Sequence, residues 1–160
     1  MTLYNHFKSK EELILAALRH MDQQWRESFV AAVERRASKP ADRLLALFDA
    51  LEEWFGREDF CGCACVKACC EFPGVKEPAH RIAGQHHQMV YSYVRGLAAD
   101  AGAPDPDMLA TRLMLLVRGA IVWAQISGKV DAASQAREAG EVLIRDVIGR
   151  TSRGKSRKTL

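Results

Sequence analysis

The chain has little that would build a β-sheet or cross a membrane. No window combines strict alternation of apolar and polar residues with enrichment in β-branched side chains, and Leu and Ala dominate instead. The longest apolar stretch, residues 113–126, is interrupted by Arg118, Gly119 and Gln125 and is too short for a membrane span. The N-terminus lacks the charged and then apolar pattern of a signal peptide. These absences predict an all-α, cytoplasmic protein with no membrane partner.

The features of an enzyme are also sparse. No nucleophile-elbow glycine pattern surrounds a serine. Residues 149–156 satisfy the phosphate-loop pattern G-x-x-x-x-G-K-[ST], but that loop needs a strand before it and a helix after it. Here a predicted helix precedes it and only four residues follow. A cysteine nucleophile with His86 or His87 stays open, because such partners can lie far apart in a sequence. We expect no enzyme and no cofactor.

Acidic side chains are absent from the last eleven residues, which hold five of the 23 basic ones. The rest of the chain carries 18 basic and 20 acidic side chains, so its body is not a basic nucleic-acid-binding surface. Low hydrophobicity and like charges predict that residues 150–160 form a disordered tail. Such a tail is either simply solvated or weakly attracted to phosphate groups.

Proline and glycine divide the chain into six segments with helical periodicity. The predicted helices cover about 10–36, 41–57, 63–71, 78–100, the stretch from the 104–107 turn to 128, and 132–148. Residues 9–12 read as a capping box, in which Ser9 is the N-cap and Glu12 reaches back to it, so the first helix begins near Lys10. With 160 residues, of which 48% are apolar, the chain is long enough for one compact domain, or one domain plus a fragment.

Residues 2–13, TLYNHFKSKEEL, carry a specific pattern. They resemble the end of the recognition helix of TetR-family repressors and the start of the next helix. The matching positions are Thr2, Leu3, Tyr4, His6, Phe7, Ser9, Lys10, Glu11 and Leu13. Further along, Gly62-Cys63, Ala68 and Glu71 resemble a Gly-Cys…Ala-x-x-Glu helix found in one subgroup of the family's effector domains. The later helices fit in order and length. The resemblance implies an all-α, TetR-like helical bundle.

The resemblance also implies a division of the chain. The family places two helices and most of the recognition helix before this motif, whereas here only Met1 precedes it. Residues 1–13 are thus expected to be a remnant of the helix-turn-helix domain, and residues 14–149 an effector-binding and dimerisation domain. The implied function is a ligand-responsive transcriptional repressor whose DNA binding is compromised in this chain. By resemblance, the residues expected at operator DNA phosphates are Thr2, Tyr4, His6 and Lys10, although Tyr4 alternatively packs in a core.

Two further sites follow from the implied fold. In the family, the last two helices pair with a second chain as a four-helix bundle. The expected homodimer interface comprises Leu116, Gly119, Ala120, Trp123, Ala136, Gly140, Leu143 and Val147, although these residues alternatively form ordinary core within one chain. Helix bundles bind ligands between facing helices. The expected effector pocket comprises Trp54, Phe55, His86, Met89, Tyr93, Met114 and Trp123. Those side chains suit an apolar or aromatic small molecule with one or two polar groups.

All the cysteines of the chain lie within ten residues: Cys61, Cys63, Cys65, Cys69 and Cys70. Three interpretations stay open. Reduced cysteines pack as small apolar residues, exposed thiols react, and thiols with histidines such as His80, His86 or His87 bind soft metals. None of the usual paired C-x-x-C knuckles is present. The second and third interpretations define an alternative function, in which the chain is a thiol, redox or metal sensor.

Overall fold

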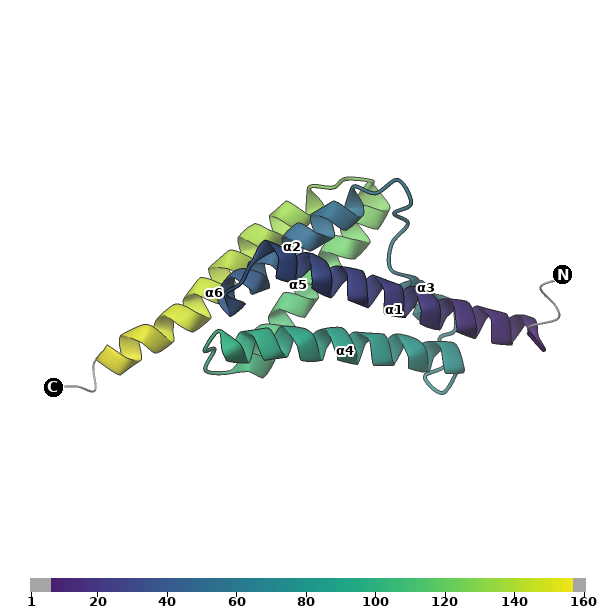
Figure 1. Cartoon of the computed structure of the whole chain (residues 1–160), viewed down its shortest axis with the longest axis horizontal. Helices are drawn as coiled ribbons and strands as arrows, with labels where there is room; N and C mark the ends of the chain where they lie inside the picture. The colour runs from purple at the N-terminus through teal and green to yellow at the C-terminus, as the bar shows by residue number, and fades with distance from the viewer. Residues whose placement is uncertain (1–6, 157–160) are drawn as a thin grey trace.

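The computed structural model describes the backbone of residues 7–156 and the side chains of residues 7–149. Within this described part, all regular secondary structure is α-helical, which confirms the all-α prediction. The helices are α1 (Lys10–Arg36), α2 (Pro40–Phe55), α3 (Ala64–Glu71), α4 (Pro78–Asp100), α5 (Pro106–Ser127) and α6 (Ala132–Ser156) (Figure 1).

Local sequence sets most of the helix boundaries. The Ser9 hydroxyl accepts a hydrogen bond from the backbone N–H of Glu12 at 3.1 Å, as expected of an N-cap. The Glu12 carboxylate accepts from the backbone N–H of Lys8 at 2.7 Å, and not from that of Ser9 as the capping box predicts. Proline occupies the first turn of α2, α4 and α5, where its missing N–H costs no helical hydrogen bond.

The last helix ends later than the sequence predicts. Helix α6 continues to Ser156, past the expected end near residue 148 and into the basic segment. The physical reason lies in the residues that follow position 148. Gly149 and Gly154 weaken a helix by about 1 kcal/mol each but leave every backbone donor in place, and no proline follows to remove one.

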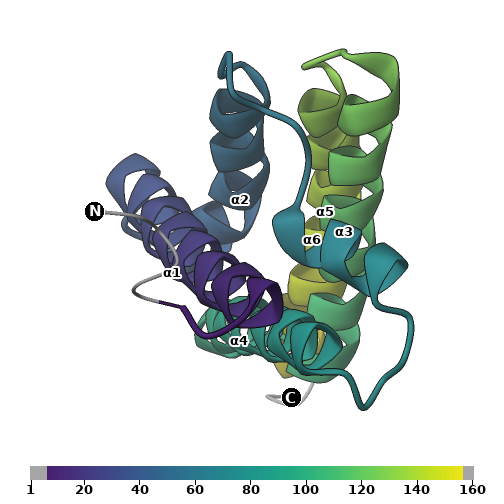
Figure 2. The same ribbon diagram turned by 90° about the vertical axis from the view of Figure 1, so that its right-hand side faces the viewer.

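The helices pack so that α2 occupies the middle of the bundle. Helices α5 and α6 lie side by side, α2 packs against both of them, and α1 and α4 cover the remaining sides of α2 (Figure 2). The short helix α3 lies against α1 and α4. Helix α5 is long and apolar enough to cross a membrane by length and composition alone. Its side chains Leu113, Val117 and Ile121 lie instead in the core of the bundle.

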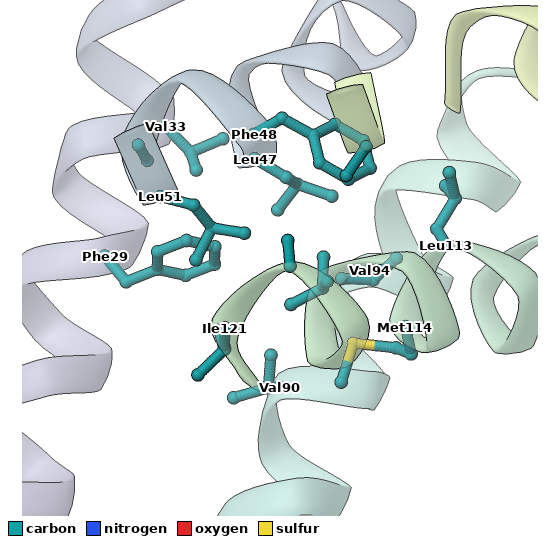
Figure 3. Packing of buried hydrophobic residues seen from close by; sticks show 14 of the residues in the cluster. Phe29, Val33, Leu47, Phe48, Leu51, Val90, Val94, Leu113, Met114 and Ile121 are labelled. Carbon is teal, nitrogen blue, oxygen red and sulfur yellow. The ribbon is translucent and has the colours of Figure 1, made fainter. Parts of the chain in front are cut away.

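The core is built around one face of α2. Leu44, Leu47, Phe48 and Leu51 are each at most 1% exposed, which the i, i+3, i+4, i+7 spacing of these residues explains. Side chains from α1, α4 and α5 meet this face (Figure 3). Each fully buried side chain of this size contributes roughly 1.5–3 kcal/mol of transfer free energy. This packing brings together α1, α2 and α4, which border the cavity described below.

A close approach between α2 and α6 depends on a glycine. A Cβ atom at Gly140 would lie 2.7 Å from Cε2 of Phe48, closer than side chains tolerate. Phe48 is only 1% exposed and lies among the core side chains, so its ring could move only by displacing its neighbours. Gly140 therefore allows α6 to pack closely against Phe48 within the same chain.

We predict that Gly140→Ala lowers the free energy of unfolding by about 1–3 kcal/mol, because the added methyl group overpacks the core against Phe48. The matched control is Gly84→Ala in α4, where nothing lies within 4 Å of the added Cβ. The control should gain up to about 1 kcal/mol from helix propensity. Urea denaturation followed by circular dichroism measures both changes. Equal effects of the two substitutions would contradict the close α2–α6 contact.

Candidate ligand cavity and cysteine cluster

A cavity of about 580 Å³ opens between α1, α2, the loop that precedes α3, and α4. Its inner wall is aromatic. The rings of Trp25 and Phe29 stack with centroids 4.7 Å apart, and Trp54 meets Trp25 edge-on at 5.2 Å. Trp54 also contacts Phe60 edge-on, with centroids 5.0 Å apart, which joins the wall to the loop before α3. Such rings offer a large apolar surface of fixed shape to a flat ligand.

The outer border of the cavity is charged. Glu27, Glu53, Arg57 and Asp59 line it and are all exposed, so this is the side that meets the surface. Glu53 pairs with Arg36, whose hydrogen bond lowers the pKa of that carboxyl. Arg57 pairs with Asp59 at 2.9 Å. Because Glu53, Arg57 and Asp59 already have ion-pair partners, the aromatic wall and the buried polar end are the parts most available to a ligand.

The buried polar end of the cavity is Asp22 with His86. These side chains are 8% and 2% exposed, and His86 Nδ1 lies 2.7 Å from Asp22 Oδ1. Arg26 donates to both carboxylate oxygens, at 2.8 and 3.1 Å. Burial raises the pKa of Asp22, but the hydrogen bonds from Arg26 and His86 outweigh it and lower that pKa. Asp22 is therefore a carboxylate, so Nδ1 of His86 donates and Nε2 is left free for another partner.

That partner is a pair of thiols. The side-chain donor atoms of Cys63, Cys65 and His86 all lie within 4.8 Å of one another, and Cys63 Sγ is 4.0 Å from His86 Nε2. Arg118 Nη1 lies 3.8 Å from the same sulfur. A hydrogen bond from Cys65, helped by His86, lowers the pKa of Cys63, whereas that bond and burial raise the pKa of Cys65. The buried pair thus favours one thiolate on Cys63.

The backbone before α3 explains why both sulfurs face the same way. Gly62 has φ of +91°, and a Cβ there would lie 2.1 Å from Oε1 of Gln125 in α5. Only glycine accepts both this conformation and this contact without displacement. The loop then enters α3 with Cys63 as its N-cap and Cys65 in its first turn. Cys63 thus lies just before the helix, whereas the sequence predicts a helix that begins at this residue.

The structure brings only two of the seven predicted pocket residues to this cavity. Trp54 and His86 line it. Phe55 and Met114 are buried in the core, while Met89 and Trp123 are 41% and 65% exposed. Tyr93 is half-buried, and its hydroxyl oxygen is buried without a hydrogen-bond partner in the described structure. The physical reason is that the cavity borders α4 only at His86, so the later residues of that helix do not reach it.

The residues predicted for the dimer interface fall into buried and exposed groups. Ala120, Ala136, Gly140 and Val147 are buried within the single chain, and Leu116 and Leu143 are half-buried. Gly119 and Trp123 are exposed. Small residues allow close approach to any neighbour, and here they serve packing between helices of one chain. The exposed apolar face of α5 and α6 instead comprises Leu115, Gly119, Val122, Trp123, Ile126 and Val142, and we call it the α5–α6 face.

The other residues that the sequence suggests for thiol or metal binding and for DNA contact lie outside the group formed by Cys63, Cys65 and His86. Cys61 and Cys70 are exposed and Cys69 is half-buried. His80 Nδ1 lies 3.1 Å from the backbone oxygen of Phe72, and His87 lies beside Arg118. Lys10 is exposed at the first position of α1, whereas Thr2, Tyr4 and His6 lie outside the described residues.

Sequence reasoning missed Asp22, Arg26 and Arg118 as members of the site. Asp22 and Arg26 are four residues apart on a helix, a spacing typical of a solvated surface ion pair. Nothing near them in the sequence points to His86, which lies 64 residues away. Arg118 appears only as an interruption of an apolar stretch.

Solved structures with a similar fold include several TetR-family transcriptional regulators. SCO4454, a TetR-family transcriptional regulator from Streptomyces coelicolor, is 27% identical and superposes with a TM-score of 0.83 over 91% of this chain and 77% of that one. A putative TetR transcriptional regulator from Streptomyces avermitilis is 29% identical, with a TM-score of 0.68 over 87% of this chain and 79% of that one. In sequence and in fold, the chain is similar to TetR-family transcriptional regulators. No family model matches the chain.

A curated relative is also a transcriptional regulator. The HTH-type transcriptional regulator YjdC of Escherichia coli is 28% identical over 122 residues, which are 74% of this chain and 62% of that protein. The chain thus spans less than two thirds of this relative. A TetR regulator from Chloroflexus aurantiacus, 22% identical with a TM-score of 0.75 over 89% of this chain and 74% of that one, shares the fold.

Proposed function

We propose that residues 14–149 form the effector-binding and dimerisation domain of a cytoplasmic, ligand-responsive transcriptional repressor. The cavity behind Trp25, Phe29 and Trp54 carries this proposal, because it combines a large aromatic wall with one buried polar end. Ligand sites of this kind are concave, mostly apolar and equipped with a few polar groups. The TetR-family relatives are transcriptional regulators and not enzymes, which supports a binding role for the cavity.

The geometry favours a flat apolar or aromatic effector with one polar group. The stacked rings of Trp25 and Phe29 offer a face for such a ligand, and His86 and Asp22 lie at the inner end for its polar group. An effector changes DNA affinity only if it binds one conformation of the dimer better than the other. Helices α1 and α4 both contribute to the cavity, so a ligand there contacts two elements whose relative positions can differ between such states.

We predict that Ala50→Phe abolishes effector binding, because Ala50 lines the cavity and a benzyl group there fills it. A panel of planar aromatic compounds is screened by thermal shift, and each compound that raises the melting temperature of the wild type is tested on the variant. The control is Ala99→Phe on the exposed side of α4, which should leave the shift unchanged.

Circular dichroism checks that both variants fold. Stabilisation by the same compounds that persists in Ala50→Phe would place the effector outside this cavity. A panel in which no compound binds the wild type would argue against an aromatic effector.

We further propose that two copies of the chain pair through the α5–α6 face. Leu115 is 69% exposed, Trp123 65% and Ile126 82%. Large apolar side chains of this kind gathered on one face typically mark an interaction surface. No atom lies within 4 Å of the position that a Cβ of Gly119 would take, which leaves room for another backbone to approach. A second copy is the occupant that the family supports, because isologous pairs present the same face to each other.

We predict that the wild type is a dimer and that Val122→Glu with Ile126→Glu makes it a monomer, because four carboxylates would be buried together in the isologous interface. Sedimentation velocity measures the mass. The control is Met89→Glu, which also places a charge at an exposed apolar position but lies on α4 away from this face. A dimeric double variant would refute the assignment of the interface.

For DNA, we propose that residues 1–13 correspond to the end of a helix-turn-helix domain. The resemblance of that stretch supports this, with Thr2, Tyr4, His6 and Lys10 as phosphate contacts. Contacts of this kind hold a protein on the duplex without reading its sequence. The side chains that read base edges in the major groove precede Thr2 in the family, so a protein made of these 160 residues alone would lack them.

We predict that the 160-residue chain binds DNA weakly and without sequence preference. Fluorescence anisotropy compares a duplex from upstream of its own gene with a scrambled duplex of equal length. Equal affinities that fall steeply with added salt are expected. A preference of tenfold or more for the upstream duplex would contradict the proposal.

A further inference from the structure

We infer that Cys63, Cys65 and His86 form a binding site for one soft metal ion, and that Cu⁺ is the ion that fits it. The cluster combines two thiol sulfurs and one imidazole nitrogen, the donors that soft metals prefer. Its members are 5%, 4% and 2% exposed, so an ion held there would be shielded from water except on the side of the cavity.

The spacing of the donor atoms is close to that of a metal centre. With metal–sulfur bonds of about 2.3 Å and metal–nitrogen bonds of about 2.0 Å, bound sulfur and nitrogen lie roughly 3.5–3.7 Å apart. Cys63 Sγ and His86 Nε2 are 4.0 Å apart, and no pair in the cluster exceeds 4.8 Å. Small side-chain rotations therefore suffice to bring all three donors onto one ion, and no helix has to move.

The surroundings prepare His86 for this role. Asp22 accepts from Nδ1 at 2.7 Å, which leaves Nε2 as the atom directed at the sulfurs. A carboxylate behind a histidine is the usual partner of a metal-binding imidazole, because it fixes the tautomer and the ring orientation. Asp22 is itself held through both oxygens by Arg26. This support is already complete before any ion binds.

The charges near the cluster favour Cu⁺ over Zn²⁺. Two thiolates and Cu⁺ leave one net negative charge, and the guanidinium of Arg118, 3.8 Å from Cys63 Sγ, offsets it. Two thiolates and Zn²⁺ are already neutral, so Arg118 adds an uncompensated positive charge beside the dication. Zn²⁺ also prefers four ligands, whereas the described residues supply three. Thiolate ligands favour soft ions, of which Cu⁺ is one.

This inference does not depend on the proposed effector role of the cavity, since metal binding is measured on the chain itself. A bound ion would link the loop before α3 to α4, and through Asp22 to α1. Cys63 already favours the thiolate, so the thiol of Cys65 releases its proton to solvent when the ion binds.

The test titrates the reduced, metal-free chain with Cu⁺ under anaerobic conditions against a chromogenic Cu⁺ chelator, and with Zn²⁺ against a fluorescent zinc chelator. We expect one Cu⁺ per chain. Cys63→Ser and Cys65→Ser should each weaken Cu⁺ binding at least 100-fold. Asp22→Asn keeps all three donors but weakens their support, and should cost about 10- to 100-fold in affinity.

The matched controls are Cys61→Ser and Cys70→Ser, which remove exposed thiols outside the cluster and should leave the affinity unchanged. Circular dichroism confirms that each variant is folded. Cu⁺ binding that survives Cys63→Ser with Cys65→Ser, or that is lost in the two controls, would overturn the site. A higher affinity of the chain for Zn²⁺ than for Cu⁺ would overturn the assignment of the ion.

Discussion

The hydrogen bond between Asp22 and His86 is the contact that connects the parts of the candidate site. It joins α1 to α4 where the aromatic wall, the thiol pair and the cavity meet. A buried carboxylate is costly unless it is paired, and Arg26 and His86 together satisfy Asp22. The bond also fixes which nitrogen of His86 faces the cysteines. The position of one carboxylate on α1 thus decides what the inner end of the cavity presents to a ligand.

The helices were predictable because their boundaries depend on neighbouring residues. Ser9 and the prolines at 40, 78 and 106 act within one turn of the helix they begin, so a local pattern is enough to find them. The sequence-based bounds of α1 and α4 agree with the structure. The end of α6 was missed because Gly149 is a weak local stop, and a weak stop does not override a continuous helix.

The site was less predictable because tertiary contacts create it. An aspartate and an arginine four residues apart look like a surface pair on any helix, and only the packing of α1 on α4 buries Asp22. The role of the small residues in α5 and α6 was equally hard to predict. Gly140 and Ala120 permit close approach, but the sequence does not say whether the neighbour is a second chain or Phe48 of the same one. The resemblance of residues 2–13 was enough to suggest the family from the sequence. The positions of single side chains could be found only from the three-dimensional structure.

The two proposed ligands share one cavity and are therefore coupled. The aromatic wall and the cluster of Cys63, Cys65 and His86 border the same space, with His86 common to both. An ion bound to His86 Nε2 would occupy the nitrogen that could otherwise hydrogen-bond the polar group of an organic effector. With the ion bound, the cavity would favour effectors that contact only the aromatic rings of Trp25, Phe29 and Trp54. An organic effector would contact α1 directly at Trp25, whereas an ion would be linked to α1 only indirectly, through His86 and its partner Asp22. Because α1 directly follows the segment that resembles the end of a recognition helix, α1 is the helix through which the proposed repressor would couple the cavity to DNA.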